Sequence, residues 1–222
     1  ALEAEGRRPH WRFRLSGGTV SWADGVRGEA EIQTSALSDP VLVREDGTVL
    51  YTFASVVDDI DMAVTEIVRG EDHVANTAVQ IELFRALGAE PPRFAHHNLI
   101  IAASGEEMSK RKGTLSIRSF REAGAEPTAL AAIAVLTGTS ESVRPVQSLD
   151  ELAGLLALDK VSRAPAKFDP AEVESLSART LHEMPYALAT PRLARFGLPE
   201  ASAEPFWLAV RGNLGRFEDV KA

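Results

Sequence analysis

The fold is decided by the stretch AVTEIVRGEDH, residues 63–73. Its first six residues are rich in β-branched side chains and predict a buried strand, which ends at the polar residues 69–72. From residue 75 to residue 87 the apolar side chains follow helical spacing, and Gly88 ends the predicted helix. A second strand is predicted over residues 97–101. A strand, a helix and a strand within about forty residues form a βαβ unit, so we predict a parallel sheet.

The stretch LIIAASGEEMSKRKG, residues 99–113, continues this unit. Its apolar start predicts the end of a buried strand, and its second part predicts a loop with three successive cations at Lys110, Arg111 and Lys112. Ligands bind at the carboxyl ends of strands in open α/β sheets, so a basic loop there suits a polyanion such as a nucleoside triphosphate. A solvated basic turn is the alternative that charge alone leaves open.

Composition limits the possible classes of protein. The chain has 222 residues, of which 45% are apolar and 25% charged, as expected for globular material with one large or two small cores. We find no run of about 18 apolar residues and no leader-like start, so we expect neither a membrane span nor secretion. The absence of Cys excludes disulfides and thiolate zinc sites. A net charge of −8 argues against indiscriminate nucleic-acid binding but leaves room for a local basic groove.

The flanking segments differ in their predicted structure. Residues 1–47 are β-rich: residues 10–15 and 19–22 predict a hairpin around the turn at 16–18, and residues 41–44 predict another short strand. From Thr114 onward the pattern is helical. The signals there are a helix ending at Gly124, a helix opened by Pro127, a capping box from Ser148 to Glu151, and Asp169 as N-cap before Pro170.

Four segments together carry a resemblance to a known family. They are LYTFASVVDD at 50–59, IVRGEDH at 67–73, NTAVQI at 76–81 and MSKRKG at 108–113. In this order they resemble bacterial glutamyl-tRNA synthetases, which are class I aminoacyl-tRNA synthetases, and MSKRKG resembles the variant form of the KMSKS signature that this family uses. The resemblance covers residues 37 to about 185, and residues 1–36 fit the family less distinctively.

The resemblance implies an α/β plus α fold. It implies the second half of a class I Rossmann-like, parallel-sheet catalytic domain at residues 48–113, preceded at 1–47 by a β-rich remnant of the acceptor-stem-binding insertion. A helical stem-contact domain follows at 114–185, and the start of an anticodon-binding region at 186–222.

The resemblance also implies roles for single residues. Lys110 matches the signature lysine that reaches the triphosphate of ATP and stabilises the charge that develops as pyrophosphate leaves, which makes it the expected catalytic residue. The other expected contacts to ATP come from Asp72, from Leu99 and Ile100 as an apolar wall for adenine, and from Met108, Ser109 and Arg111. The chain departs from the family at Glu107, where many relatives carry the first signature lysine.

Three residues match positions that hold the amino-acid substrate in the family: Tyr51, Ser55 and Arg69. A guanidinium and a phenol suit glutamate, which carries two carboxylates. From the residues alone, the alternative is a structural Arg69 paired with Glu71 or Asp72.

The implied reaction joins glutamate and ATP to give glutamyl-adenylate and pyrophosphate, and then transfers the glutamyl group to tRNA(Glu). We find no set of nucleophile, base and orienting group, which fits a reaction that depends on positioning and charge stabilisation. Mg²⁺ is expected with the ATP phosphates, and no zinc or other metal site is expected in the chain. We further expect a cytoplasmic monomer that binds no membrane.

The sequence contains no His-Ile-Gly-His-like signature, which in the family lies upstream of the part matched here. We therefore expect the chain to be an incomplete portion of the enzyme, which alone does not activate glutamate. Three alternatives stay open: a glutaminyl or glutamyl-queuosine synthetase relative, a non-catalytic tRNA-binding module, and a structural domain whose cations are solvated.

Overall fold

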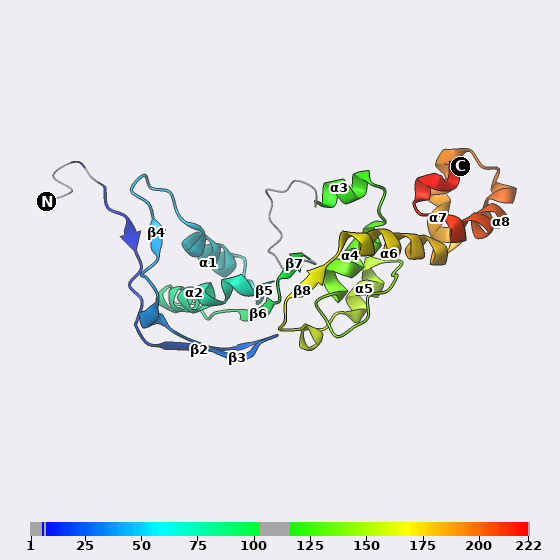
Figure 1. Cartoon of the computed structure of the whole chain (residues 1–222). Coiled ribbons are helices and arrows are strands. Elements are labelled where there is room, and N and C mark those ends of the chain that lie inside the picture. Colours follow the sequence, from blue (N-terminus) through cyan, green and yellow to red (C-terminus); the bar gives the residue numbers. More distant parts are fainter. Residues whose placement is uncertain (1–5, 7, 103–115, 222) are drawn as a thin grey trace. The chain divides into compact units, whose positions relative to one another are not determined.

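The structure is a computed structural model that describes residues 6, 8–102 and 116–221 (Figure 1). The chain divides into two compact units, Ala1–Leu99 and Ile100–Ala222. Each unit has its own hydrophobic core and is described by itself.

The first unit is built on a four-stranded mixed sheet with the strand order β3-β2-β6-β5. β2 (Thr19–Asp24) and β3 (Gly28–Gln33) form an antiparallel hairpin, and β5 (Glu66–Gly70) and β6 (Arg93–His97) are parallel neighbours. β2 joins β6 in parallel at one position, where Asp24 lies opposite Phe94. The end of the hairpin is therefore beside the central strand of the sheet.

The N-terminal hairpin has different partners from those the sequence predicts. β1 (Trp11–Arg12) pairs with β4 (Val41–Val43), and β2 pairs with β3 rather than with residues 10–15. Residues 16–18 do not form the turn of that hairpin. Instead this segment is hydrogen-bonded to a helix, because the backbone N–H and the hydroxyl of Ser16 both donate to the carboxylate of Glu82, at 2.8 and 2.6 Å. A short 3-10 helix, η2 (Thr34–Ala36), follows β3.

The βαβ unit is present, but its second strand begins earlier than predicted. β5 leads through the 3-10 helix η3 (Glu71–His73) into α2 (Val74–Ala86) and then into β6, which covers residues 93–97 rather than 97–101. The sequence pattern favours the later residues because His96 is polar whereas residues 99–101 are apolar. His96 is nevertheless buried, because Asp24 bonds its ring. Residues 100–102 form β7 (Ile100–Ala102) in the second unit.

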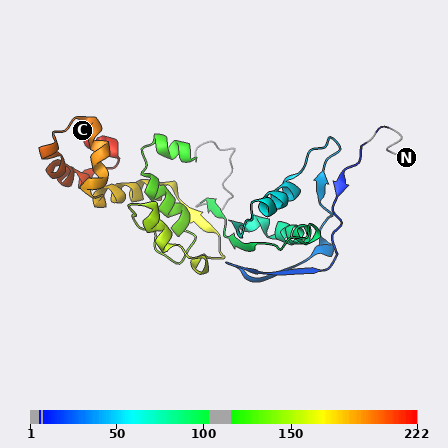
Figure 2. The ribbon, with the colours of Figure 1, turned by 180° about the vertical axis from the view of Figure 1, so that it is seen from behind.

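The core of the first unit lies between its sheet and two helices. α1 (Tyr51–Asp61) packs beside α2, and Figures 1 and 2 show both helices on the same side of β2 and β3. α2 is buried along residues 77–84, and its apolar side chains meet Val56 of α1, Val20 of β2 and Phe94 of β6. This burial fixes α2 against the carboxyl end of β5.

The second unit is mainly helical, with the parallel pair of β7 and β8 (Ala166–Phe168). Its α-helices are α3 (Ile117–Glu122), α4 (Pro127–Leu136), α5 (Leu149–Leu155), α6 (Pro170–Glu183), α7 (Tyr186–Leu193) and α8 (Glu200–Val210). Its short 3-10 helices are η5 (Leu158–Lys160), η6 (Ala194–Phe196), η7 (Arg211–Asn213) and η8 (Phe217–Lys221). The predicted N-caps are confirmed, since Ser148 Oγ accepts from the N–H of Glu151 and Asp169 Oδ1 accepts from the N–H of Ala171. The second bond of the predicted capping box differs, because the carboxylate of Glu151 accepts from the N–H of Gln147 rather than from that of Ser148.

Two hydrophobic clusters make up the core of the second unit. One lies among α4, α5 and α6, and the other among α7, α8 and η8, with α6 contributing to both. Between them Glu126, which is 3% exposed, accepts two hydrogen bonds from the guanidinium of Arg192, at 2.8 and 2.9 Å. Of the helices in the described residues, none is both long and apolar enough to cross a membrane.

Candidate functional site

The candidate site of the first unit lies around Arg69, at the carboxyl end of β5. β6 runs parallel to β5 in a register that places His96 beside Arg69. α2 begins directly after η3 and brings Thr77 and Gln80 to the same place, while α1 supplies Ser55. Two strands and two helices therefore converge on one guanidinium.

Arg69 makes three hydrogen bonds to neutral side chains. Its Nη2 donates to Thr77 Oγ1 and to Gln80 Oε1, both at 2.7 Å, and its Nε donates to His96 Nε2 at 3.2 Å. The amide of Gln80 is held in turn by Ser55, because Gln80 Nε2 donates to Ser55 Oγ at 3.0 Å. These contacts orient the guanidinium without cancelling its charge, and the phenol of Tyr51 is a further hydrogen-bonding neighbour of Arg69.

His96 connects Arg69 to a buried carboxylate. The imidazole is fully buried, and its Nδ1 is hydrogen-bonded to Asp24 Oδ2. An arginine N–H can only donate, so Nε2 of His96 must accept the bond from Arg69, and the ring proton belongs on Nδ1. This assignment follows from the network of hydrogen bonds. The chain of contacts therefore runs from the carboxylate of Asp24 through a neutral imidazole to the guanidinium.

Burial and hydrogen bonding set the charge of each member. Burial lowers the pKa of Arg69, an effect that the neighbouring phenol of Tyr51 partly offsets. For Asp24, burial raises the pKa, but the bonds from His96 and from backbone N–H groups outweigh it and bring the pKa down to about 2. Burial lowers the pKa of His96, although Asp24 acts in the opposite direction. At neutral pH the site thus combines an ionised Asp24, a neutral His96 and a cationic Arg69.

Asp72 and Leu99 lie together beside Gly70. A methyl group placed on Gly70 would lie 2.5 Å from Asp72 Oδ1 and 3.2 Å from Leu99 Cδ2. The side chain of Asp72 is 58% exposed, and its Oδ2 lies 3.8 Å from His73 Nε2. The glycine therefore leaves room for a carboxylate and an apolar side chain to meet at the end of β5.

Glu71 is not a partner of Arg69. Its carboxylate accepts from Arg27 Nη1 at 2.6 Å, so the salt bridge that the sequence left open for Arg69 forms with a different arginine. Within the described residues, no salt bridge joins Arg69 to Asp72. Among the described residues, no carboxylate is bonded directly to the guanidinium, although Asp59 and Asp72 act on it electrostatically.

The other predicted residues are placed as follows. Tyr51, in the first turn of α1, is 58% exposed, and its ring lies 6.2 Å from that of His73. Ile100 belongs to the second unit, where it is 37% exposed and pairs with Ala166. Met108, Ser109, Lys110 and Arg111 lie outside the described residues.

Sequence reasoning missed four members of the network: Asp24, Thr77, Gln80 and His96. Thr77 and Gln80 carried a weak signal, because they are polar residues one helical turn apart in an apolar helix. Asp24 and His96 carry no local signal of this kind. No local pattern joins two residues that are 72 positions apart.

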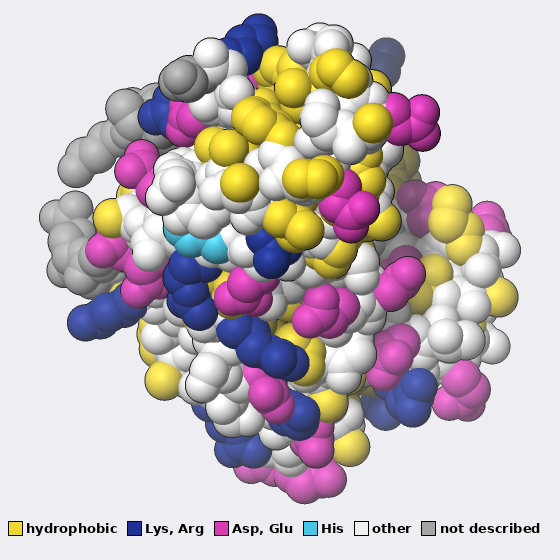
Figure 3. Space-filling view, turned by 90° about the vertical axis from the view of Figure 1, so that its right-hand side faces the viewer, with side chains coloured by type: hydrophobic (Ala, Val, Ile, Leu, Met, Phe, Trp, Pro, Cys, Tyr) yellow, Lys and Arg dark blue, Asp and Glu magenta, His cyan; other side chains and the backbone are white. Residues whose placement is uncertain are grey.

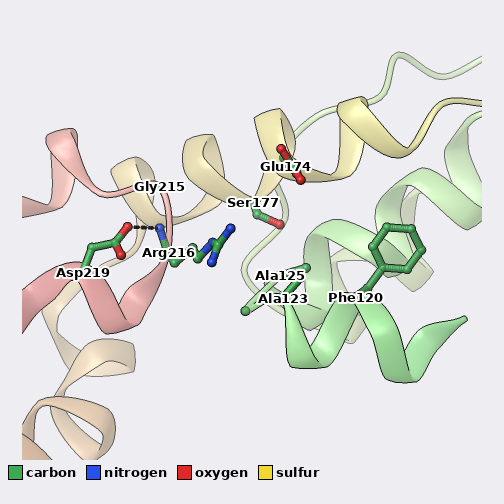
Figure 4. Close-up of a pocket in the computed structure, with 9 residues that line it drawn as sticks. Phe120, Ala123, Ala125, Glu174, Ser177, Gly215, Arg216 and Asp219 are labelled. Atoms are coloured by element: carbon green, nitrogen blue, oxygen red, sulfur yellow. Dashed lines mark hydrogen bonds between the residues drawn. The ribbon is translucent and has the colours of Figure 1, made fainter. Parts of the chain in front are cut away.

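The second unit contains a separate hollow of about 260 Å³, drawn in Figure 4. It lies between the link from α3 to α4, the middle of α6 and the start of η8, and Phe120, Glu174, Ser177 and Arg216 are among its lining residues. Figure 4 shows Arg216 between Asp219 and Ser177, and the backbone N–H of Arg216 donates to Asp219 Oδ2 at 2.9 Å. No residue predicted for the site belongs to its lining.

Charged side chains of both signs alternate over the face shown in Figure 3, and hydrophobic side chains gather near its top. That face presents no extended area of a single charge. An extended basic area is the pattern that favours binding of a phosphate backbone. Among the described residues, no group of three or more His, Asp or Glu side chains could hold a metal ion.

Comparison with known proteins finds relatives of a single family. Residues 2–175 match the model of the family described as tRNA synthetases class I (E and Q), catalytic domain. The chain is 64% identical over 220 residues to glutamate–tRNA ligase 2 of Methylobacterium sp. (strain 4-46), covering 99% of this chain and 49% of that protein. It is 61% identical over 219 residues to glutamate–tRNA ligase 2 of Xanthobacter autotrophicus (strain ATCC BAA-1158 / Py2), covering 99% and 47%.

A solved structure is also similar. The crystal structure of a glutamate tRNA ligase from Elizabethkingia meningosepticum CCUG26117, in complex with its amino acid, matches with a TM-score of 0.79 and 26% identity. The match covers 99% of this chain and 49% of that one. The chain thus spans about half the length of the curated relatives it matches.

Proposed function

The chain belongs to the class I tRNA synthetases of the glutamate and glutamine type, and from this premise we propose that it contributes to a glutamate–tRNA ligase. Its fold is that of the catalytic domain of this class, with mixed sheets and helices. The proposed reaction forms glutamyl-adenylate from glutamate and ATP, releases pyrophosphate and transfers the glutamyl group to tRNA(Glu).

The observation that carries this proposal is that Arg69 has no salt bridge to any carboxylate among the described residues. Its three side-chain acceptors are neutral, so the guanidinium can pair with a carboxylate of the substrate. Tyr51, exposed at the start of the neighbouring helix, is the proposed second contact. Ser55 acts through Gln80, whose amide it holds. A fixed cation favours glutamate over glutamine, because glutamine lacks the second negative charge.

The proposed ATP site uses the residues at the end of β5 and the segment after β7. Asp72 and Leu99 lie side by side at Gly70, where a carboxylate can accept from the nucleotide and an apolar group can cover the base. Ile100, Met108, Ser109 and Arg111 are the further proposed contacts. ATP enters as its magnesium complex, and the metal is part of this substrate.

The proposed chemical step needs positioning and charge stabilisation. A carboxylate oxygen of glutamate attacks the α-phosphorus of ATP, the new O–P bond forms, and the bond to the bridging oxygen breaks as pyrophosphate leaves. Arg69 holds the amino acid in place for this attack. Lys110 stabilises the negative charge that accumulates on the leaving pyrophosphate.

The remaining parts have proposed roles in tRNA binding. Residues 1–47 belong to the region that contacts the acceptor stem, 114–185 to a helical stem-contact domain, and 186–222 to the start of an anticodon-binding region, around the catalytic segment at 48–113. The cytoplasmic location and the monomeric state stay predictions.

The test is a chimera in which this chain replaces the matching 220 residues of the Methylobacterium relative. We expect glutamate-dependent pyrophosphate exchange and charging of tRNA(Glu) by the unchanged chimera. Gln80→Glu puts a carboxylate on Arg69 without removing the arginine, so we expect the KM for glutamate to rise at least about tenfold while the KM for ATP stays the same. Gln33→Glu is the matched control, because the side chain of Gln33 is exposed on β3 and its amide donates to Thr19 Oγ1.

Two results would contradict the proposal. One is an active chimera that uses glutamine in place of glutamate. The other is an unchanged KM for glutamate in Gln80→Glu, because the charge of Arg69 would then have no role in binding the substrate.

A further inference from the structure

We infer that His96 is a positioning residue, whose unprotonated Nε2, kept in that form by Asp24, fixes the guanidinium of Arg69 for the substrate carboxylate. The role in substrate binding rests on the proposed function, whereas the hydrogen-bond state of His96 does not. His96 itself touches no substrate in this proposal and acts through Arg69.

The carboxylate of Asp24 can present only one of its oxygens to the imidazole. Oδ1 accepts three backbone N–H groups, from Val26, Arg27 and His96, at 3.0 to 3.1 Å. Oδ2 is left to accept from His96 Nδ1, and it also accepts from Trp22 Nε1 at 3.2 Å. Because the backbone N–H groups fix the orientation of this carboxylate, they also fix which nitrogen of the His96 ring carries the proton.

The imidazole is also held by its neighbours. The ring of Phe94 lies nearly parallel to it, with centroids 6.3 Å apart, and the ring of Trp22 meets it edge-on at 6.4 Å. Thr77 Oγ1 lies 2.9 Å from Nε2 and accepts from Arg69 Nη2. Exchanging the two ring nitrogens by rotation would break the contacts at both ends of the ring, so the tautomer and the orientation of the ring are fixed together.

The charged groups around His96 come from two strands and the β2–β3 turn. Asp24 faces Nδ1 from β2, and Arg69 faces Nε2 from β5. Arg27, in the β2–β3 turn, acts on the ring electrostatically while its guanidinium is paired with Glu71. α2 presents Thr77, which does not titrate. A protonated Nε2 would point an N–H at the N–H of Arg69, so protonation of His96 would release the guanidinium.

Two substitutions at His96 separate positioning from structural support. The amide of an asparagine lies near the position of Nδ1, so His96→Asn can still donate to Asp24 but does not reach Arg69. The amide of a glutamine lies near the position of Nε2, so His96→Gln can still accept from Arg69 but leaves Asp24 without its imidazole. A positioning role therefore predicts that the KM for glutamate is close to the unchanged value in His96→Gln and rises about tenfold or more in His96→Asn.

A merely structural role predicts the opposite order. The buried carboxylate keeps its side-chain partner only in His96→Asn, so that variant should be the more stable of the two. If the KM for glutamate follows stability, with His96→Gln the worse variant, the positioning role is refuted.

Asp24→Asn provides a second test, because it reverses the tautomer. Three backbone N–H groups require an oxygen at the position of Oδ1, so the new NH₂ group faces His96 Nδ1 and can only donate. Nδ1 must then accept, and the ring proton moves to Nε2, where it opposes the N–H of Arg69. The same logic explains why an amide in place of the aspartate disables the histidine of a serine-protease triad.

The decisive measurement is nitrogen NMR of the histidine rings in the complete 222-residue chain, assigned with His96→Gln. At pH 7 we expect the spectrum of a neutral His96 with the proton on Nδ1, and in Asp24→Asn the spectrum of the opposite tautomer. A protonated ring, or a proton on Nε2 in the unchanged chain, would overturn the inference.

Kinetics of pyrophosphate exchange in the chimera then separate the two proposals. With the expected tautomer, an equal KM for glutamate in both His96 variants would refute positioning. An unchanged KM for glutamate in Gln80→Glu would instead refute the proposed role of Arg69, whatever the spectrum of His96.

Discussion

Replacing Gly70 by alanine should displace the carboxylate of Asp72 without unfolding the chain. The backbone of Gly70 has φ −66° and ψ 148°, a conformation that alanine adopts freely. The added methyl carbon would lie 2.5 Å from Asp72 Oδ1, whereas ordinary contact begins at 3.4 Å, so this oxygen must move by about 0.9 Å. Asp72 is exposed and can rotate away, and the methyl of Leu99 needs to move only a few tenths of an ångström.

The expected change in stability is small and can be favourable. Alanine restricts the unfolded chain, which stabilises the folded state by about 0.4–1 kcal/mol at a compatible position. The lost contact between Asp72 and His73 is exposed and 3.8 Å long, so it contributes little. We therefore expect the free energy of unfolding to stay within about 1 kcal/mol of its original value.

ATP binding should respond much more strongly. A hydrogen bond to a charged group is worth about 1.5–3 kcal/mol, so moving the carboxylate of Asp72 should raise the KM for ATP about tenfold or more in pyrophosphate exchange by the chimera. Gly154→Ala is the matched control, because a methyl at Gly154, within α5, meets nothing within 4 Å. An unchanged KM for ATP in Gly70→Ala would refute the role of Asp72. A chain that fails to fold would contradict the expectation that the side chain of Asp72 can rotate away from the added methyl group.

Two further predictions concern the stability of each unit. Arg192→Met leaves Glu126 buried without its cation, so we expect the free energy of unfolding of the second unit to fall by about 3 kcal/mol. Hydrogen exchange in α4 and α7 measures this change, and a loss below about 1 kcal/mol would show that the ion pair is not needed for stability. In the first unit, the pKa of Asp24 is lowered from 3.8 to about 2, so the unfolded carboxyl takes up its proton first as the pH falls. The free energy of unfolding should therefore be constant above pH 4 with respect to this group and fall between about pH 4 and 2, and Asp24→Asn should remove that part of the slope in urea titrations.

Local signals predicted the elements whose ends are fixed by neighbouring residues. Ser148 and Asp169 cap their helices because a side-chain oxygen meets an N–H two or three residues further on, and this pattern is visible in the sequence. Pro127 begins α4 because its fixed φ and its missing N–H suit the first position of a helix. Such contacts depend only on residues within one turn of each other.

Elements defined by distant contacts were predicted less well. The segment 16–18 has the composition of a hairpin turn, but Ser16 bonds Glu82, 66 positions away, and the chain runs on instead of folding back. The predicted strand begins at residue 97 rather than at residue 93, because the polar His96 gives no signal for a buried strand. In both places a polar residue is buried or held by a partner that lies far along the chain.

The network around Arg69 shows what the sequence pattern cannot contain. Arg69 could be placed at a strand end, but whether its charge is cancelled depends on three acceptors from α2 and β6, and on Asp24 behind one of them. A buried polar group left without its partner costs about 1–3 kcal/mol, so Thr77, Gln80 and His96 are each unfavourable alone and acceptable only together. Apolar side chains of similar size would fill the same core without polar atoms that need hydrogen-bond partners. A set of buried polar residues that holds one cation without a salt bridge among the described residues is what the proposed binding of a substrate carboxylate requires.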